Sequence, residues 1–266
     1  MKNASRALAA LLIAIALPLA GAVQTARAAD PLIVGANIGN VPWEFAERGG
    51  TFVGFEIDLA KAVGARLDRE VEIVNIPFNG LFPAVQSGRV DIAVSSITIT
   101  PQRLGSVAFA QPYYESAQSL TVLGRSEVRA LADLDGRVVG VDTGSTGDMW
   151  ATREAEALGI GEIRRYEGLA PAMLDLQAMR IDAYLSDIPA MQYYVRDKPF
   201  LQVVARIETG ERYSMMFARG NPLADEVDAV IGALKRDGVL ARLHETWFGA
   251  VPAADSATVV VLPRPE

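Results

Sequence analysis

Residues 91–103 combine side chains suited to binding a small charged molecule. Three hydroxyl residues follow the apolar run 92–94: Ser95, Ser96 and Thr98. Thr100-Pro101 then has the form of a helix N-cap followed by the proline favoured at a first helical position. Because ligands of open α/β sheets lie beyond the carboxyl ends of strands, we expect these hydroxyls to face a binding site. Arg103 adds a planar fork of donors suited to a carboxylate. The alternative is a capped loop beside a solvated arginine.

Two further polar segments could contribute to the same chemistry. Residues 142–147 read Asp-Thr-Gly-Ser-Thr-Gly and open a predicted helix, which places Asp142 and Thr146 at an anion-receptive helix N-terminus. No Gly-Lys-Ser/Thr follows, which argues against a nucleotide phosphate loop. Ser186 and Asp187 end another apolar strand. Asp187 is therefore an N-cap for the next helix, a ligand contact, or both.

The elements expected to position these residues alternate between strands and helices. The apolar patterns predict this order: strand 32–34, helix 55–67, strand 71–76, helix 79–88, strand 92–94, strands 118–123 and 138–141, helix 171–179, strand 182–187, helix 188–194, strand 213–218, and helices 223–237 and 239–248. Such βαβ order implies a mostly parallel sheet. Asn37 and Asn40 follow the first strand, and Phe78 stands at a strand-to-helix switch. Trp43 offers an aromatic face for a ligand, although a place in the core fits the pattern equally well.

The composition limits the class of protein. With 266 residues, 50% of them hydrophobic, the chain can bury a sizeable core. Residues 1–28 have the form of a cleaved secretory signal peptide, although a retained membrane anchor is the alternative. Its removal would take away three basic residues and no acid, moving the net charge from −7 to −10. An acidic exported protein is a poor candidate for binding nucleic acid. No cysteine and one histidine, His244, leave little for a metal site, and no cofactor is expected.

Several motifs, in order, resemble one family. They are residues 54–59 (Gly-Phe-Glu-Ile-Asp-Leu), 78–88, 95–103, 109–114, 140–147, 182–187 and the closing Trp247-Phe248-Gly249. Together they resemble the family-three extracellular solute-binding proteins, the periplasmic amino-acid receptors of ATP-driven importers. The resemblance covers the chain from about residue 30 to about residue 250.

The resemblance implies a two-lobed periplasmic-binding-protein-like type II α/β fold, each lobe a mostly parallel sheet flanked by helices. It places residues 30–113 with 216–250 in the first lobe, 118–210 in the second, and hinge crossovers at 113–117 and 211–215. It implies a monomer that binds a free amino acid or derivative and delivers it to an inner-membrane ABC permease. We expect residues 251–266 to form a mobile tail, with an edge strand at 259–262 as the alternative.

The resemblance also assigns roles to residues in the cleft. Arg103 would hold the ligand carboxylate with Ser96 or Thr146, while Asp187 and Thr98 would take the ammonium group. Asn37, Asn40, Phe78, Asp142 and Ser186 would surround the side chain of the ligand. Many relatives carry an acid where this chain has Asn37 and an aromatic residue where it has Asn40. Losing the acid argues against a dedicated receptor for cationic side chains, although Asp142 could restore that preference if it faces the cleft. These residues suggest a polar amino acid or derivative without naming it.

Two other functions remain open from sequence alone. A few relatives of this fold are cyclohexadienyl dehydratases, and Glu44 or Asp142 could supply the acid that such an enzyme needs. A ligand sensor for a separate membrane receptor is the other alternative. A binding protein without catalysis is the main hypothesis.

Overall fold

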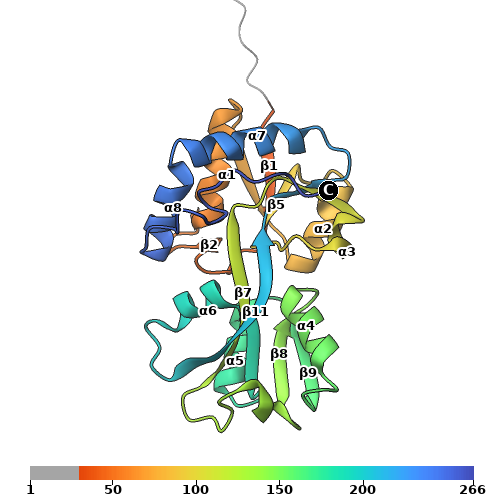
Figure 1. The fold of residues 1–266 in the computed structure, drawn as a ribbon, viewed down its shortest axis with the longest axis vertical. Coiled ribbons are helices and arrows are strands. Elements are labelled where there is room, and N and C mark those ends of the chain that lie inside the picture. The colour runs from red at the N-terminus through yellow and green to blue at the C-terminus, as the bar shows by residue number, and fades with distance from the viewer. Residues whose placement is uncertain (1–29) are drawn as a thin grey trace, which may run out of the picture.

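The computed structural model describes residues 30–266, so the predicted signal peptide, 1–28, lies outside the described residues. The chain forms two lobes stacked along the long axis of the molecule (Figure 1), each built on its own five-stranded sheet. The first sheet has the order β4-β1-β5-β12-β6 and the second β11-β7-β10-β8-β9. This confirms the predicted two-lobed α/β fold.

Lobe 1 holds the N-terminal and C-terminal parts of the described chain. Its elements are β1 (Leu32–Ala36), β2 (Phe45–Ala46), β3 (Phe52–Val53), α1 (Phe55–Arg66), β4 (Val71–Asn75), α2 (Phe78–Gln86), β5 (Ile92–Val94), α3 (Pro101–Leu104), β6 (Val107–Phe109), β12 (Met216–Ala218), α7 (Leu223–Arg236) and α8 (Val239–Phe248). Strand β1 pairs in parallel with β4 and β5, whereas β12 runs antiparallel to both β5 and β6.

Lobe 2 is formed by the middle of the chain. Its elements are β7 (Tyr114–Leu123), the short 3-10 helix η1 (Leu131–Leu134), β8 (Val138–Asp142), α4 (Thr146–Glu154), β9 (Glu162–Tyr166), α5 (Leu169–Gln177), β10 (Ala183–Asp187), α6 (Ile188–Val195) and β11 (Leu201–Tyr213). Strand β8 pairs in parallel with β9 and β10, and β7 runs antiparallel to β10 and β11.

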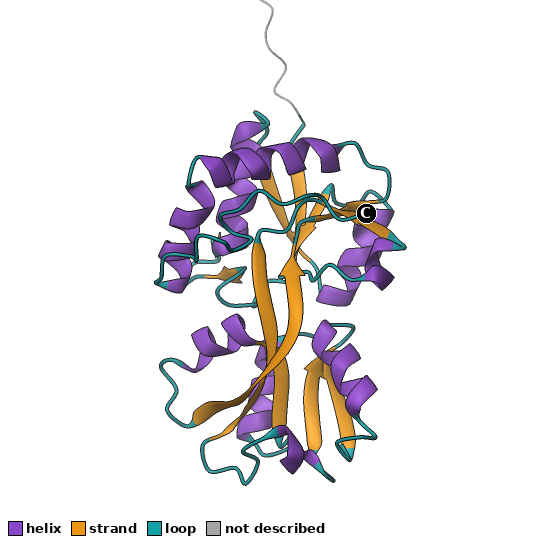
Figure 2. Ribbon diagram, viewed as in Figure 1, coloured by secondary structure: helices purple, strands orange, loops and turns teal. Residues whose placement is uncertain are grey.

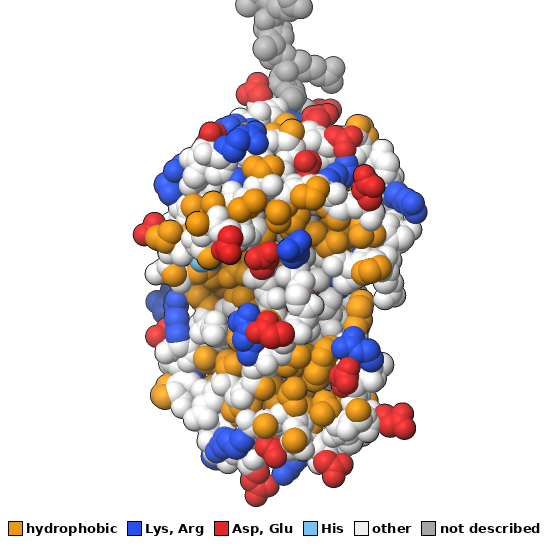
Figure 3. Space-filling view, in the orientation of Figure 1, with side chains coloured by type: hydrophobic (Ala, Val, Ile, Leu, Met, Phe, Trp, Pro, Cys, Tyr) orange, Lys and Arg blue, Asp and Glu red, His pale blue; other side chains and the backbone are white. Residues whose placement is uncertain are grey.

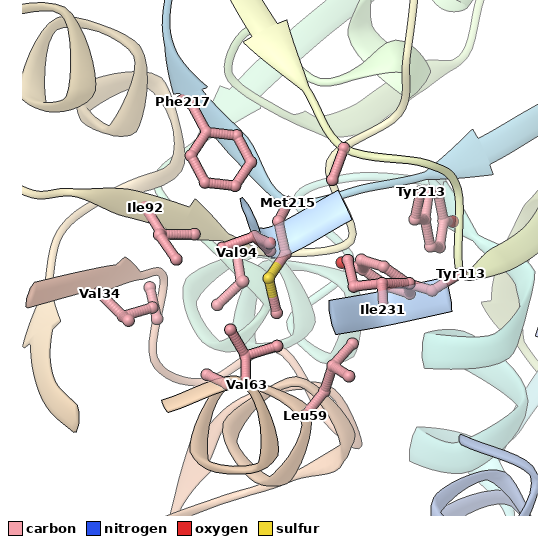
Figure 4. Packing of buried hydrophobic residues seen from close by; sticks show 14 of the residues in the cluster. Val34, Leu59, Val63, Ile92, Val94, Tyr113, Tyr213, Met215, Phe217 and Ile231 are labelled. Carbon is pink, nitrogen blue, oxygen red and sulfur yellow. The ribbon is translucent and has the colours of Figure 1, made fainter. Parts of the chain in front are cut away.

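The core of lobe 1 fixes the strand ends that carry the hydroxyl residues. In Figure 4, Val34 of β1 and Val94 of β5 converge with Leu59 and Val63 of α1 around Met215. All five side chains are fully buried. Burying side chains of this size contributes roughly 1.5 to 3 kcal/mol each. The polar loops that leave β1 and β5 are therefore held by a rigid base.

The two crossovers between the lobes form a paired ribbon. Strands β7 and β11 run side by side from one lobe to the other (Figure 2), with Tyr114 opposite Tyr213 and Ser116 opposite Glu211. The register shifts between Ile207 and Glu211, which marks an irregularity next to the crossover. The predicted hinge segments, 113–117 and 211–215, lie in this ribbon and in the residues directly flanking it. Their hinge action stays a prediction.

The expectation of a mobile tail is wrong. Residues 251–266 contain no helix or strand but pack on lobe 1, where Ala257 and Thr258 are buried. The Thr258 hydroxyl donates to the Tyr113 carbonyl over 3.0 Å, and the buried Lys235 ammonium donates to the Val260 carbonyl over 2.9 Å. A backbone carbonyl before β7 and a side chain of α7 thus supply the partners that a free tail would lack.

On the face shown in Figure 3, basic and acidic side chains are interspersed over both lobes. Within residues 30–266, no helix combines the length and apolar character needed to cross a membrane.

Candidate ligand-binding site

A small cavity of about 30 Å³ lies between the two lobes. Eleven of the twelve predicted site residues line it: Asn37, Asn40, Phe78, Ser95, Ser96, Thr98, Arg103, Asp142, Thr146, Ser186 and Asp187. The lobes touch directly around it, because Ser96 Oγ donates to Asp187 Oδ2 over 3.0 Å and the Thr98 and Thr146 hydroxyls lie 3.5 Å apart. This space is on the scale of one water molecule, so a larger ligand must enter an open form and, once the lobes close on it, replace the direct contacts between them.

Arg103 is a buried cation on the lobe 1 side of the cavity. Thr100 caps α3 by accepting from the Arg103 backbone N–H, which confirms the predicted N-cap. The Arg103 guanidinium donates to the Thr98 carbonyl over 2.8 Å and, across the lobes, to the Gly144 carbonyl over 3.2 Å. Its centre lies 5.4 Å from the Phe78 ring centroid and 5.2 Å from that of Phe82. The planar group is thus oriented by two carbonyls and two rings.

Burial lowers the pKa of Arg103 to about 10, while the negative charges of Glu211 and Asp187 oppose that shift. The residue is 4% exposed, and its guanidinium stays charged at neutral pH. Its Nε has no hydrogen-bond partner among the described residues. A solvated surface arginine, the alternative considered from sequence, is therefore excluded.

Asp187 faces Arg103's side of the cavity from lobe 2. It occupies the N-cap position of α6, but its side chain makes no capping hydrogen bond. Its carboxylate instead accepts from Ser96 Oγ and, over 2.5 Å, from Gln118 Nε2. Burial and then the charge of Glu211 raise the pKa of Asp187 to about 7. The geometry favours the ligand-facing interpretation over the capping one.

Two fully buried acids support the wall of hydroxyls from beneath. Glu56 of α1 accepts from the Ser96 backbone N–H at 2.9 and 3.0 Å, and Ser96 has a φ of 44°, a conformation that non-glycine residues rarely adopt. Glu44 accepts from Ser95 Oγ over 2.6 Å and from Asn40 Nδ2 over 3.1 Å. Burial raises the pKa of both acids, and the charge of Glu56 raises that of Glu44 further.

Asp142 reaches the cavity from the end of β8, next to the N-terminus of α4. Burial raises the pKa of Asp142 to about 6. Ser145 caps α4 by accepting from the Asp148 backbone N–H, so the helix begins at Thr146, and the predicted place of Thr146 at a helix N-terminus is confirmed.

Trp43 is the one predicted site residue that does not line the cavity. Its side chain is fully buried in the core of lobe 1, where its ring lies 5.6 Å from Phe55, 4.7 Å from Tyr114 and 5.0 Å from Phe248. The interpretation of Trp43 as a core residue is therefore correct. Aromatic residues from the crossover and from α8 surround its ring. Glu44, proposed as an acid for an enzyme, likewise lies behind Ser95 and not in the lining.

Sequence reasoning missed Gln118 and Ser145, which line the cavity, and Glu211, which contacts the lining residues Thr98 and Gln118. One signal was available for Gln118, namely a polar side chain inside an otherwise buried strand. Whether that side chain points toward the cavity depends on how β7 pairs with its neighbours, and the sequence alone did not show that pairing.

Comparisons with known proteins agree with this architecture. The family model described as bacterial extracellular solute-binding proteins, family 3, matches residues 32–250. The L-arginine-binding protein of Pseudomonas aeruginosa is 30% identical over 249 residues, 90% of this chain and 95% of its own. The L-cystine-binding protein TcyJ of Escherichia coli is 26% identical, covering 86% of this chain and 87% of its own.

A solved structure has the same fold. It is an ancestral arginine-binding protein bound to arginine, with a TM-score of 0.79 and 32% identity, covering 84% of this chain and all of that one. The matched segment contains both lobes and every residue of the cavity lining. This chain therefore belongs to the bacterial extracellular solute-binding proteins of family 3.

Proposed function

We propose that the chain is a periplasmic receptor that binds a free amino acid, or an amino-acid derivative, between its lobes and delivers it to an inner-membrane ABC importer. The observation that carries this proposal is the placement of Arg103 and Asp187, two oppositely charged side chains from different lobes, on one cavity.

The proposal follows from the chemistry of a zwitterion. Burying an amino acid requires a cation and donors for its carboxylate, together with an anion and acceptors for its ammonium group. Arg103 supplies the first set, with the Ser96 hydroxyl or Thr146 at the N-terminus of α4. Asp187 supplies the second set, with the Thr98 hydroxyl.

Closure of the lobes follows from the same placement. A ligand held by Arg103 on one lobe and Asp187 on the other binds the closed form more tightly than the open form, and so shifts the equilibrium toward closure. The β7–β11 ribbon is the connection about which the lobes would rotate. The ligand would replace the direct contact between Ser96 and Asp187.

The location and the partner are supported by relatives. The family is extracellular. The curated relatives include amino-acid-binding proteins of ABC transporters. We infer export through residues 1–28 and docking of the closed form on a permease. Sequencing the N-terminus of the protein recovered from the periplasm would test the export step, with Ala29 expected as the first residue.

A thermal-shift screen against the common amino acids and their derivatives tests ligand binding. A ligand at about 100 times its dissociation constant adds roughly 2.7 kcal/mol to the free energy of unfolding. Calorimetric titration would give the affinity of each hit. Small-angle scattering should then show a smaller radius of gyration at saturation.

The control is Asp187→Asn, which keeps the shape of the side chain but removes the charge. It should fold and lose the thermal shift. Hits that stabilise this variant as much as the parent protein, or the absence of any hit among amino acids and derivatives, would contradict the proposal.

A further inference from the structure

Two carboxyl groups, those of Glu44 and Glu56, are fully buried behind the cavity wall without a cation. Both residues are 0% exposed, and their side chains are hydrogen-bonding neighbours. The ion pairs within residues 30–266 include neither of them. Burying an unpaired carboxylate is strongly unfavourable, and two ionised carboxylates in contact repel each other. One proton shared by the pair removes the repulsion and one of the buried charges.

The donors around Glu56 favour its ionised form. The Ser96 backbone N–H donates to both of its oxygens, at 2.9 and 3.0 Å, and the Tyr113 hydroxyl donates to Oε1. Hydrogen bonds donated to a carboxylate stabilise its charged form. Glu56 is therefore the member of the pair that carries the negative charge.

The donors around Glu44 leave one of its oxygens free. Ser95 Oγ and Asn40 Nδ2 both donate to Oε1, over 2.6 and 3.1 Å. Oε2 is buried and receives no hydrogen bond from any group of the described chain. A protonated carboxyl group has one O–H donor beside an acceptor oxygen. A proton on Oε2 makes Glu44 a donor to Glu56 and keeps Oε1 as the acceptor.

The pair holds three residues of the cavity lining in place. Glu44 orients the Ser95 hydroxyl and the Asn40 amide. The same amide donates to Ser96 Oγ over 3.1 Å. Glu56 holds the Ser96 backbone at a φ of 44°, in the left-handed region that non-glycine residues rarely adopt. Since all three residues line the cavity, the shape of its wall depends on the buried pair.

We propose that Glu44 is a neutral carboxylic acid whose Oε2–H donates to the ionised carboxylate of Glu56, and that this pair positions the lining residues for the ligand. Glu44 and Glu56 are thus positioning residues, which act through Asn40, Ser95 and Ser96. The inference rests on the proposed function, since it takes the cavity as the amino-acid site.

The surroundings of the pair let its proton be measured apart from those of the cavity. Burial raises the pKa of Glu44 well above its ordinary range, and the charge of Glu56 raises it further. The titratable side chain that faces the pair from the crossover is Tyr113, whose pKa burial and the charge of Glu56 raise well above its ordinary value, so it stays a donor. The loops after β1 and β5 face the pair with neutral amide, hydroxyl and N–H groups. Asp187 lies on the far side of the Ser96 hydroxyl.

Infrared spectroscopy at pH 8 tests the proton without any ligand. Ordinary carboxyl groups are ionised there, and Asp187, with its pKa of about 7, is largely ionised as well. The parent protein should show the carbonyl stretch of one protonated carboxyl group, and Glu44→Gln should lose it. Glu72→Gln, at an exposed position of β4, is the control and should keep the band. A parent spectrum without the band, or a band that survives in Glu44→Gln, would overturn the inference.

Chemical denaturation from pH 6 to 8 gives a second measurement. The folded chain keeps a proton that the unfolded chain releases above about pH 4.3, so this proton makes the parent protein less stable as pH rises. Glu44→Gln has no such proton, and its unfolding constant relative to the parent should fall by about ten-fold per pH unit. Contributions of Asp187 and Asp142 cancel in this ratio because both proteins contain them. Glu56→Gln should keep the parental slope, and the reverse pattern would place the proton on Glu56 and contradict the assignment.

Calorimetric titration tests the positioning role. The probes are L-arginine and L-glutamine or, where neither binds, the amino acid with the largest thermal shift. Glu44→Gln keeps a donor toward Glu56 and an acceptor toward Ser95, so its affinity should exceed that of Glu44→Ala by about ten-fold. Glu44→Leu, which has a similar volume and no polar atoms, replaces the alanine variant if that variant does not fold. Equal affinities in the glutamine and apolar variants would overturn the positioning role.

The outcomes separate this inference from the proposed function. A parent protein that binds an amino acid but shows no protonated carboxyl group would overturn the inference and leave the function standing. Failure of every common amino acid to bind would overturn the proposed function and with it the positioning role. The infrared and denaturation results would still decide whether Glu44 holds the proton.

Discussion

Replacing Arg103 with alanine tests the arrangement of the site most directly. The guanidinium is held by the Thr98 and Gly144 carbonyls and by two phenylalanine rings, and it sits on the cavity with a free Nε. Without it, the carboxylate of a bound amino acid would be buried without a cation. Leaving one charge of a buried pair unmatched typically costs about 2 to 5 kcal/mol, or roughly 30-fold to several-thousand-fold in affinity.

Arg103→Lys should fall between the parent protein and the alanine variant. It keeps the charge, but a single ammonium group cannot reach both carbonyls and present a flat fork to a carboxylate. Arg219→Ala is the control, because Arg219 is an exposed arginine of lobe 1 that donates to one carbonyl, that of Gly105. It should bind like the parent protein.

Calorimetric titration of the three variants, at about pH 8 so that Asp187 stays ionised, measures these differences. The melting temperature without ligand should fall in Arg103→Ala, because the Thr98 and Gly144 carbonyls lose their donor, so folding of each variant is checked beside its affinity. Near-parental affinity in Arg103→Ala, with the fold intact, would refute the assignment of Arg103 to the carboxylate.

Four further predictions concern the core, the tail, the ligand side chain and pH. Trp43→Ala should lower the free energy of unfolding by about 3 to 5 kcal/mol while leaving the ranking of ligands unchanged, as chemical denaturation and titration would show. Truncation after residue 250 should lower the melting temperature, because Lys235 loses the Val260 carbonyl and the buried Thr258 is removed; an unchanged transition would exclude a stabilising tail. Asn37→Asp should improve lysine or arginine binding relative to neutral ligands, and an unmoved ranking would exclude Asn37 from the pocket. The affinity for a ligand ammonium should fall as pH decreases through about 7, because the raised pKa of Asp187 lets a proton compete for its carboxylate, which lies beside Glu211 and Arg103. The slope of affinity against pH should approach about ten-fold per pH unit. A flat profile from pH 8 to 6 would contradict the role of Asp187 as the partner of the ammonium group.

The sequence by itself determined the local parts of this protein. Thr100 before Pro101 marked the start of α3, and the hydroxyls after β5 were recognisable as a cleft wall, because capping and strand-to-helix switches depend on residues only a few positions apart. The order of strands and helices and the motifs of the family were likewise readable along the chain. Eleven residues of the cavity lining could be named on this basis.

The tertiary structure decided what depends on contacts between distant segments. Gln118 meets Glu211 across 93 positions, and Ser96 meets Asp187 across 91, so neither pair has a local signal. Trp43 suited a pocket or a core equally by type, and only the packing of Tyr114 and Phe248 around it settled the choice. The tail gave no periodic pattern because its partners are side chains and carbonyls of other elements, and such contacts form only when the whole lobe is assembled.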